Sequence, residues 1–178
     1  MSSLIFGNAW YINIKEPAMR EHNLKNSASI RTYILIFSFG CVFYYLTEML
    51  YRTHSHFTMA ILGGICAVVI YRINKALYNE SVIIKAFLCA VAITILEFIS
   101  GIFINLIFEM KVWDYSDRMF NILGQICPLF SLFWFLISIP ALYFCSYVDT
   151  HITPYISGRL LFLSQTKESI NEHSKKKE

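Results

Sequence analysis

The chain has little charge. Only 15% of its 178 residues are Asp, Glu, Lys or Arg, whereas 56% are hydrophobic and the mean hydropathy is +0.51. A soluble domain usually carries about 25% charged residues. This shortage of charge indicates a membrane protein, and the length predicts one compact unit without a second soluble domain.

Several catalytic and ligand-binding motifs are missing. The sequence has no GxxxxGK[ST] and its seven glycines form no phosphate-binding loop, which excludes nucleotide hydrolysis by this chain in the P-loop manner. HExxH and CxxC are absent, and no basic groove with stacking aromatics indicates a nucleic-acid partner. We therefore expect no metal site, no cofactor and no nucleic acid. The five cysteines lie inside apolar runs and are predicted to be buried thiols (Cys41, Cys66, Cys89, Cys127 and Cys145).

Four apolar stretches approach the roughly 20 residues that a membrane-spanning helix needs. They cover residues 33–51, 57–71, 82–108 and 120–148. They predict an all-α integral membrane bundle of about four transmembrane helices, in which the short second helix is the one expected to be re-entrant or tilted. The domain organisation that follows is an N-terminal tail (1–32), a transmembrane helical domain (33–148) and a C-terminal tail (149–178). The first thirty residues lack an apolar core of signal-peptide length, so no cleavage is expected.

The basic residues predict an orientation. The N-terminal tail carries four Lys or Arg, the second connection with its flank three and the C-terminal tail five, whereas the first and third connections carry one and two. The positive-inside rule then places both termini in the cytoplasm. The terminal "SKKKE" has two interpretations, contact with anionic membrane lipid or a solvated tail.

Polar residues recur with helical spacing inside three of the apolar stretches. Because polar groups in hydrocarbon are costly, such stripes are expected to face the protein interior. The second stretch instead offers small residues that permit close helix packing (Gly63, Gly64 and Ala67). The predicted stripes are Gly40, Tyr44, Thr47, Glu48 and Tyr51; Thr94, Glu97, Gly101 and Asn105; and Asn121, Gly124, Gln125, Pro128 and Ser131.

The carboxylates of Glu48 and Glu97 are the strongest functional candidates, because an acid within a span must be paired, protonated or hydrated. The smaller polar residues have a simpler interpretation as hydrogen bonds between helices. Pro128 and Pro140 are expected to do no more than kink the fourth helix.

The polar block "VWDYSDRMFNILGQICP" precedes or begins the fourth predicted span. Trp113 and Tyr115 are predicted to anchor it at the headgroup level, and Ser116 or Asp117, with Asp114 as an alternative, to cap the fourth helix. Arg118 is the nearest cation for Glu48 or Asp114. The remaining polar residues, Asn121 and Gln125, are predicted to descend along the wall of a cavity.

The motifs "LEFISG" (96–101) and "WDYSDRMFNILGQIC" (113–127) resemble those of small bacterial membrane proteins, the putative ABC-transporter type IV, or CmpB-like, family. "LFSLFWFL" and, more weakly, "FGCVFYYLTE" extend the resemblance. Two positions depart from the family pattern, since Gln125 stands where an Arg is usual and Met119 where a Pro is usual, and the family's Pro-rich stretch after the first span is missing. The resemblance implies a bacterial plasma-membrane protein and, position by position, these binding candidates: Glu48, Glu97, Trp113, Asp114, Tyr115, Asp117, Arg118, Asn121 and Gln125, to which the third stripe adds Asn105.

Two functional hypotheses follow. In the first, the chain is a permease-like protein that binds or passes a small, amphiphilic solute through an outward-facing polar cavity, together with a second copy of itself or a separate ATPase subunit. In the second, it is an intramembrane enzyme that acts on a lipid or isoprenoid headgroup, with Asp114 and Asp117 holding a metal-bound phosphate or Glu97 acting as acid or base. The absence of a nucleophile and base pair favours the first, and no catalytic residue is assigned. A membrane scaffold or regulator is the third reading.

Overall fold

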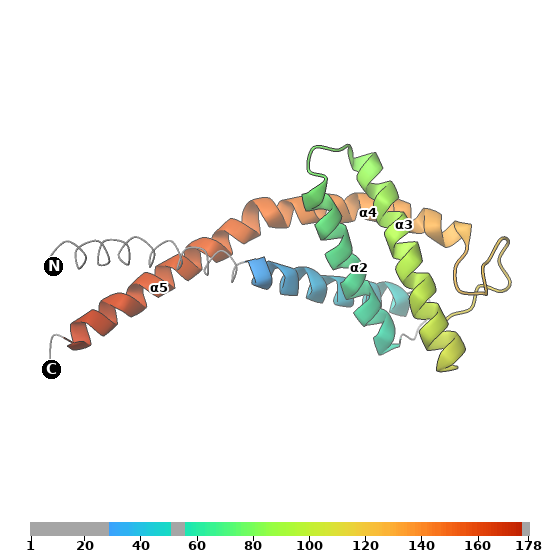
Figure 1. Cartoon of the computed structure of the whole chain (residues 1–178), viewed down its shortest axis with the longest axis horizontal. Helices are drawn as coiled ribbons and strands as arrows, with labels where there is room; N and C mark the ends of the chain where they lie inside the picture. Colours follow the sequence, from blue (N-terminus) through green and yellow to red (C-terminus); the bar gives the residue numbers. More distant parts are fainter. Residues whose placement is uncertain (1–28, 51–55, 176–178) are drawn as a thin grey trace, which may run out of the picture. The chain divides into compact units, whose positions relative to one another are not determined.

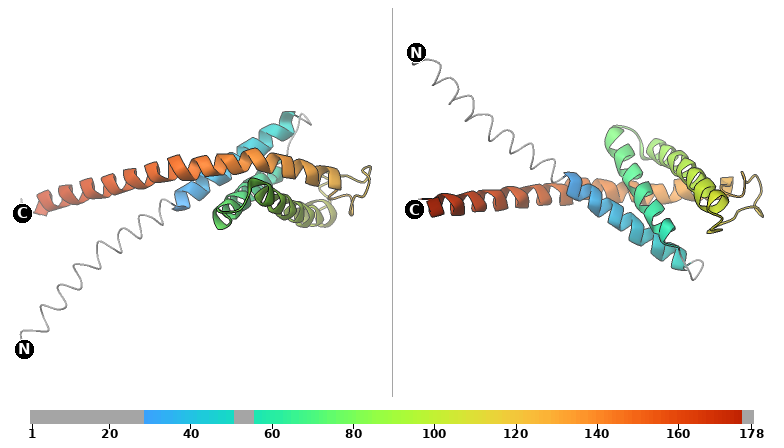
Figure 2. Two further views of the ribbon diagram at one scale, coloured as in Figure 1. Left: turned by 90° about the horizontal axis from the view of Figure 1, so that it is seen from above. Right: turned by 60° about the horizontal axis from the view of Figure 1, so that its bottom comes forward.

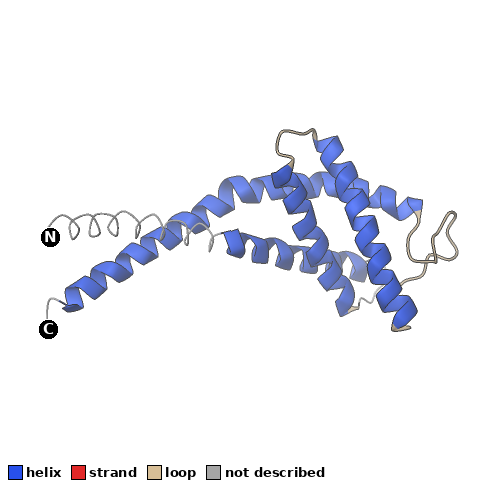
Figure 3. Cartoon of the chain, viewed as in Figure 1, coloured by secondary structure: helices blue, strands red, loops and turns tan. Residues whose placement is uncertain are grey.

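The chain is described by a computed structural model that places residues 29–50 and 56–175, with side chains up to residue 167. Helices account for most of this part, and no strand occurs in it beyond an isolated bridge between Ile122 and Ile126 (Figure 3). The elements are a first helix, Ser29–Leu50, then α2 (Phe57–Ala76), α3 (Val82–Gly101), the π-type turns of η1 (Ile102–Ile107), α4 (Pro128–Tyr147), η2 (Val148–Ile152) and α5 (Thr153–Lys175). The predicted all-α class is confirmed.

Four of these helical segments are long and apolar enough to cross a membrane: Ser29–Leu50, Phe57–Ala76, Val82–Ile107 and Pro128–Lys167. The prediction of a short second helix was wrong. The helix α2 has 20 residues, because the polar residues after Tyr71 continue its helical turns to Ala76. Polar residues end a hydropathy run without ending a helix.

The start of the fourth helix was also predicted wrongly. The helix α4 begins at Pro128, whose fixed φ and missing N–H suit the first helical position, and its N-cap residue is Cys127. Neither Ser116 nor Asp117 caps it, and Pro128 does not kink it. Residues 120–123, where the fourth span was predicted to begin, cannot be helical, because Phe120 and Leu123 have φ values of 57° and 53°.

Residues 33–148 form one compact unit. Within it α3 packs along α4, and α2 contacts both helices (Figures 1 and 2). The first helix approaches α2 through small residues, as predicted. A Cβ atom added to Gly40 would lie 2.5 Å from Ala67 Cβ and 2.6 Å from the Gly63 carbonyl oxygen, so the two backbones touch here.

The second unit is described at residues 29–32 and 149–175. In its described part, the Thr32 hydroxyl lies 3.1 Å from that of Thr153, the first residue of α5. The segment predicted as a C-terminal tail thus contains η2 and the long helix α5.

Candidate functional site

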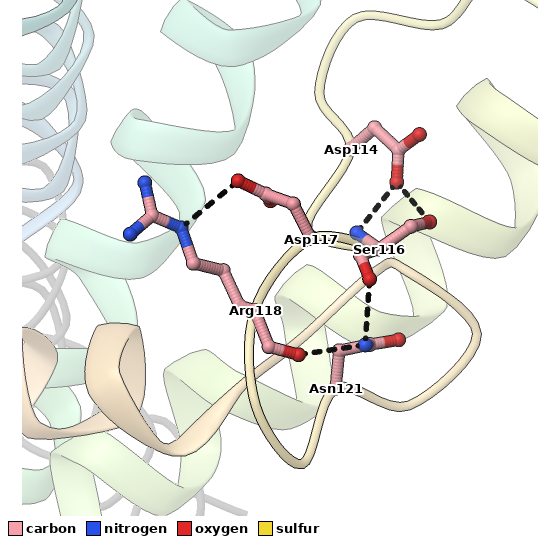
Figure 4. Close-up of polar contacts among 5 residues, drawn as sticks. All are labelled: Asp114, Ser116, Asp117, Arg118 and Asn121. Atoms are coloured by element: carbon pink, nitrogen blue, oxygen red, sulfur yellow. Dashed lines mark hydrogen bonds and ion pairs between the residues drawn. The ribbon is translucent and has the colours of Figure 1, made fainter.

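The loop between η1 and α4 is tied together by its own side chains (Figure 4). The Asp114 carboxylate accepts hydrogen bonds from the N–H and the hydroxyl of Ser116. These bonds hold the pKa of Asp114 below its ordinary value of 3.8. The Asn121 amide donates to the carbonyl oxygens of Ser116 (3.2 Å) and Arg118 (2.8 Å), and Arg118 Nε lies 3.5 Å from Asp117 Oδ2. The predicted polar block is therefore a turn that satisfies its own polar groups.

A single glycine makes the turn close. Gly124 has a φ of +68°, and a Cβ there would lie 2.6 Å from Ser116 Oγ and 2.7 Å from Asp114 Oδ1. Its N–H donates to Asn121 Oδ1 at 3.1 Å, and its carbonyl oxygen accepts from Tyr115 N–H at 2.7 Å. Only glycine fits this position without strain.

The side chain of Asn105, in η1, fastens the loop to the helices. Its amide donates to Trp113 O at 2.9 Å and to Gln125 Oε1 at 2.8 Å, while its own oxygen accepts from Val112 N–H at 2.7 Å. Gln125 in turn donates to Leu123 O at 2.9 Å. Gln125 is thus buried in this loop, and the prediction that Asn121, Gly124 and Gln125 form a stripe on the fourth helix was wrong.

The two aromatic residues of the block lie inside the protein. Trp113 is 2% exposed and Tyr115 6%, and both pack with Met59 and Cys127 in one cluster. Trp113 Nε1 donates to the Gln125 carbonyl at 3.1 Å. The prediction that they anchor the loop at the lipid headgroups was therefore wrong. An aromatic ring with one polar atom is also stable in the protein interior, where the ring is buried and the polar atom has a hydrogen-bond partner.

Glu97 joins this loop to α4. Its side chain is 2% exposed, and its two oxygens accept from different donors, Oε1 from the Tyr115 hydroxyl at 3.0 Å and Oε2 from Trp134 Nε1 at 2.8 Å. One turn along α3, Thr94 donates to Ser131 on α4 at 3.1 Å. The stripe predicted for the third span does face inward. We call Glu97, Gly101, Asn105, Trp113, Tyr115, Gln125 and Trp134 the junction.

A second feature lies beside the junction. It is an open cavity of about 740 Å³ that is lined by residues of the first helix, α2, α3, the loop and α4. Most of its lining is apolar or aromatic, notably Phe39, Phe43, Phe130, Phe133, Ile137 and Phe144. The sequence did not single out these residues, since an aromatic that lines a cavity and one that faces lipid look alike in an apolar run.

Charged groups line the cavity near one end of the helices. Glu48 and Thr47 belong to the last turn of the first helix, and Arg118 belongs to the loop that leads into α4. Glu48 is half-buried, and the Arg118 side chain is 47% exposed. At the other end the lining is apolar, with Ile36 and Phe144.

The predicted site residues therefore divide into three groups. Glu48, Tyr115 and Arg118 line the cavity, and Tyr115 is also part of the junction. Glu97, Asn105, Trp113 and Gln125 belong to the junction and hold the loop. Asp114, Asp117 and Asn121 stay in the loop, where Asp114 and Asp117 bond to Ser116 and Arg118. Tyr51, predicted for the first stripe, lies outside the described residues.

No three His, Cys, Asp or Glu side chains come together in the described ranges in a way that would hold a metal ion. His56 caps α2, where its Nδ1 accepts from Thr58 N–H at 3.4 Å. The five cysteines are free thiols, and all but the half-buried Cys41 are buried.

Comparison with known proteins gave one match. No curated protein and no solved structure is significantly similar to this chain. The family described as Putative ABC-transporter type IV matches residues 19–166. This range includes all four helical segments that are long and apolar enough to cross a membrane, apart from Lys167 at the end of the fourth. It also includes every residue of the junction and of the cavity lining. With most of its length covered by that match, the chain belongs to the Putative ABC-transporter type IV family.

Proposed function

We propose that this protein is permease-like and that it binds or passes a small solute through the cavity beside α4. The observation that carries the proposal is the cavity itself. Its volume of about 740 Å³ falls within the roughly 300 to 1,000 Å³ of small-molecule sites. Such sites are mostly apolar with a few convergent polar groups, and Glu48, Thr47 and Arg118 supply these groups here.

The charged residues of the cavity support a role in recognition. Charged side chains within spans usually face a cavity or a substrate path. Glu48 lies in the last turn of the first helix, and the basic-residue distribution predicts that this end of the helix faces the outer side of the membrane. Arg118, from the loop before α4, lines the same cavity. The cavity is accordingly proposed to be open to solutes from outside the cell.

A transport cycle needs more than these four helices. Secondary transporters use pairs of repeats around a central site, and this sequence contains no repeat. The family description and the missing P-loop both favour a separate ATPase subunit, and a second copy of the chain is the other candidate partner.

The test uses two neighbouring positions on α4. Ile137 lines the cavity, whereas Leu136 is 51% exposed and belongs to the outer surface. Small molecules that copurify with the protein are identified by mass spectrometry, and their uptake is measured in membrane vesicles from cells that produce the protein. We expect Ile137→Trp to reduce retention and uptake, because the indole obstructs the cavity part of the way along, and Leu136→Trp to leave both unchanged.

Equal retention and uptake in both variants would contradict the proposal. Thermal unfolding of the two variants in detergent controls for folding. The comparison is valid only with similar melting temperatures, and Ile137→Phe provides a smaller filling residue should the tryptophan destabilise the helix.

A further inference from the structure

We infer that the solute is a membrane amphiphile, with one extended hydrocarbon chain in the apolar part of the cavity and a zwitterionic phosphate and amine headgroup between Arg118 and Glu48. This inference rests on the proposed function and specifies its substrate class. It depends on three properties of the cavity, namely its length, its access and the charges at one end.

The length of the cavity suits one lipid chain. Along the first helix its lining runs from Ile36 to Glu48, which at 1.5 Å per residue corresponds to about 18 Å. One leaflet of the hydrocarbon core is about 15 Å thick, half of the roughly 30 Å of the bilayer. A chain that lies along the cavity therefore extends about as far as a chain in the surrounding leaflet.

The volume agrees with the length. A methylene group takes about the volume of one liquid water molecule, roughly 30 Å³. The 740 Å³ of the cavity would thus hold about 25 such groups, which is enough for a single chain with its headgroup.

Access and lining both favour an apolar occupant. Phe39, Phe133 and Leu129 line the cavity, yet they remain 44%, 43% and 45% exposed, so the wall is not closed around the space. Apolar cavities do not hold ordered water. Hydrocarbon that enters sideways from the bilayer matches this lining, whereas a wholly polar solute would lose its hydration along most of the cavity.

The charges select the headgroup. Glu48 and Arg118 have opposite signs and both line the same cavity. The Arg118 guanidinium can bind phosphate oxygens in a bidentate manner. Its contact with Asp117 is a half-exposed pair at 3.5 Å, which is weak enough to exchange for a phosphate. The Glu48 carboxylate complements the amine, so one headgroup of both signs matches the two residues.

The experiment measures binding of single-chain phosphoethanolamine amphiphiles to the full-length protein by native mass spectrometry, over a series of chain lengths. Affinity should rise about fourfold for each added methylene that is buried, up to a limiting chain length, and then level off. Ile137→Trp, which blocks the cavity part of the way along, should make affinity level off at a shorter chain. Leu136→Trp, on the outer surface, should not change the limit.

Headgroup selection is measured with three amphiphiles of equal chain length, one zwitterionic, one only anionic and one only cationic. The wild type should prefer the zwitterion. Arg118→Gln should remove its preference over the cationic compound, and Glu48→Gln its preference over the anionic compound. The same preference in all three proteins would overturn the headgroup assignment.

Two further outcomes separate this inference from the proposed function. Transport of a water-soluble solute, with binding that does not depend on chain length, would refute the amphiphile and leave the permease function standing. Chain-length dependence with a limit shifted by Ile137→Trp, but without movement of any amphiphile across the bilayer, would support the site and refute the permease.

Discussion

The junction and the cavity lie side by side in the same helical unit, but they differ in how closely their side chains pack. In the junction Glu97 and Asn105 each bind two or more partners within the protein, and helix, loop and glycine backbone are in close contact. In the cavity Glu48 and Arg118 border a volume of about 740 Å³. The comparison indicates that most of the conspicuous WDYSDR block holds the fold together, although its Tyr115 and Arg118 also line the cavity, whereas the less conspicuous aromatic lining is the part that we propose binds a ligand.

The largest expected effect is that of Glu97→Ala. The substitution leaves the Tyr115 hydroxyl and the Trp134 indole N–H without their acceptor. A buried donor left unsatisfied, such as the Tyr115 hydroxyl, costs about 1 to 3 kcal/mol, and the half-buried Trp134 costs less, so the free energy of unfolding should fall by roughly 1 to 4 kcal/mol. Thermal unfolding in detergent measures it. A loss of solute binding without any loss of stability would instead place Glu97 in the binding site, and the junction would then not be a purely structural region.

The junction should also tolerate a larger side chain less well than the cavity does. A Cβ at Gly101 would lie 2.5 Å from Gln125 Oε1 and 2.9 Å from Gln125 Cβ, so Gly101→Ala should cost about 1 to 3 kcal/mol of stability. Ala141→Leu adds more atoms, but Ala141 lines the cavity, where there is space for them. Melting temperatures of the two variants compare the regions directly, and an equal or larger loss for Ala141→Leu would mean that the cavity is as tightly packed as the junction.

A smaller effect is expected at the charged end of the cavity. The pair of Arg118 and Asp117 is largely exposed, with 47% and 73% of the side chains accessible, and such pairs contribute about 0 to 1 kcal/mol. Asp117→Ala should therefore change stability little. If Arg118 is also the ionic partner of Glu48, Arg118→Ala should lower the stability more than Asp117→Ala does. Glu48→Gln should then recover part of the stability lost in Arg118→Ala.

The double variant decides between these cases. Non-additive melting temperatures for Arg118→Ala and Glu48→Gln would show that the two residues are coupled across the cavity. Strictly additive changes would mean that Arg118 is not the ionic partner of Glu48, and the role of Arg118 would be confined to the loop.

The smallest effect concerns Asp114. Because its folded pKa lies below the ordinary 3.8, its bonds to Ser116 stabilise the fold above that pH, and the contribution disappears as the pH falls below 3.8 through the lowered pKa. Asp114→Asn keeps an oxygen acceptor for Ser116 but cannot titrate. Melting temperature measured against pH should show a shallower acid decline for Asp114→Asn than for the wild type, and an identical decline in both would refute this role.

The sequence was sufficient for the helical class and for the inward face of α3, because Glu97 and Asn105 stand out against an apolar run whose spacing is helical. It was not sufficient for residues 120–127. Phe120, Ile122 and Leu123 look like the start of a spanning helix, but hydrogen bonds from Asn105 and Asn121 hold the segment in a turn with positive φ angles. Such long-range contacts override local pattern.

The site was only partly predictable for a related reason. Glu48 and Arg118 were identified by their charge, and both line the cavity. Trp113 and Tyr115 were assigned to the lipid interface because an aromatic ring with one polar atom suits that interface and a hydrogen-bonded interior equally well. The cavity itself arises from the space between helices, which residue spacing along one helix does not encode.

A density map of the purified protein in lipid tests the central claim most directly. It shows whether the cavity, rather than the junction, holds a ligand, and it gives the number of copies at the same time. We predict an elongated density that runs beside Phe39, Phe133 and Phe144 and ends in a polar group between Glu48 and Arg118. The absence of both space and density between Phe39 and Phe133 would contradict the account.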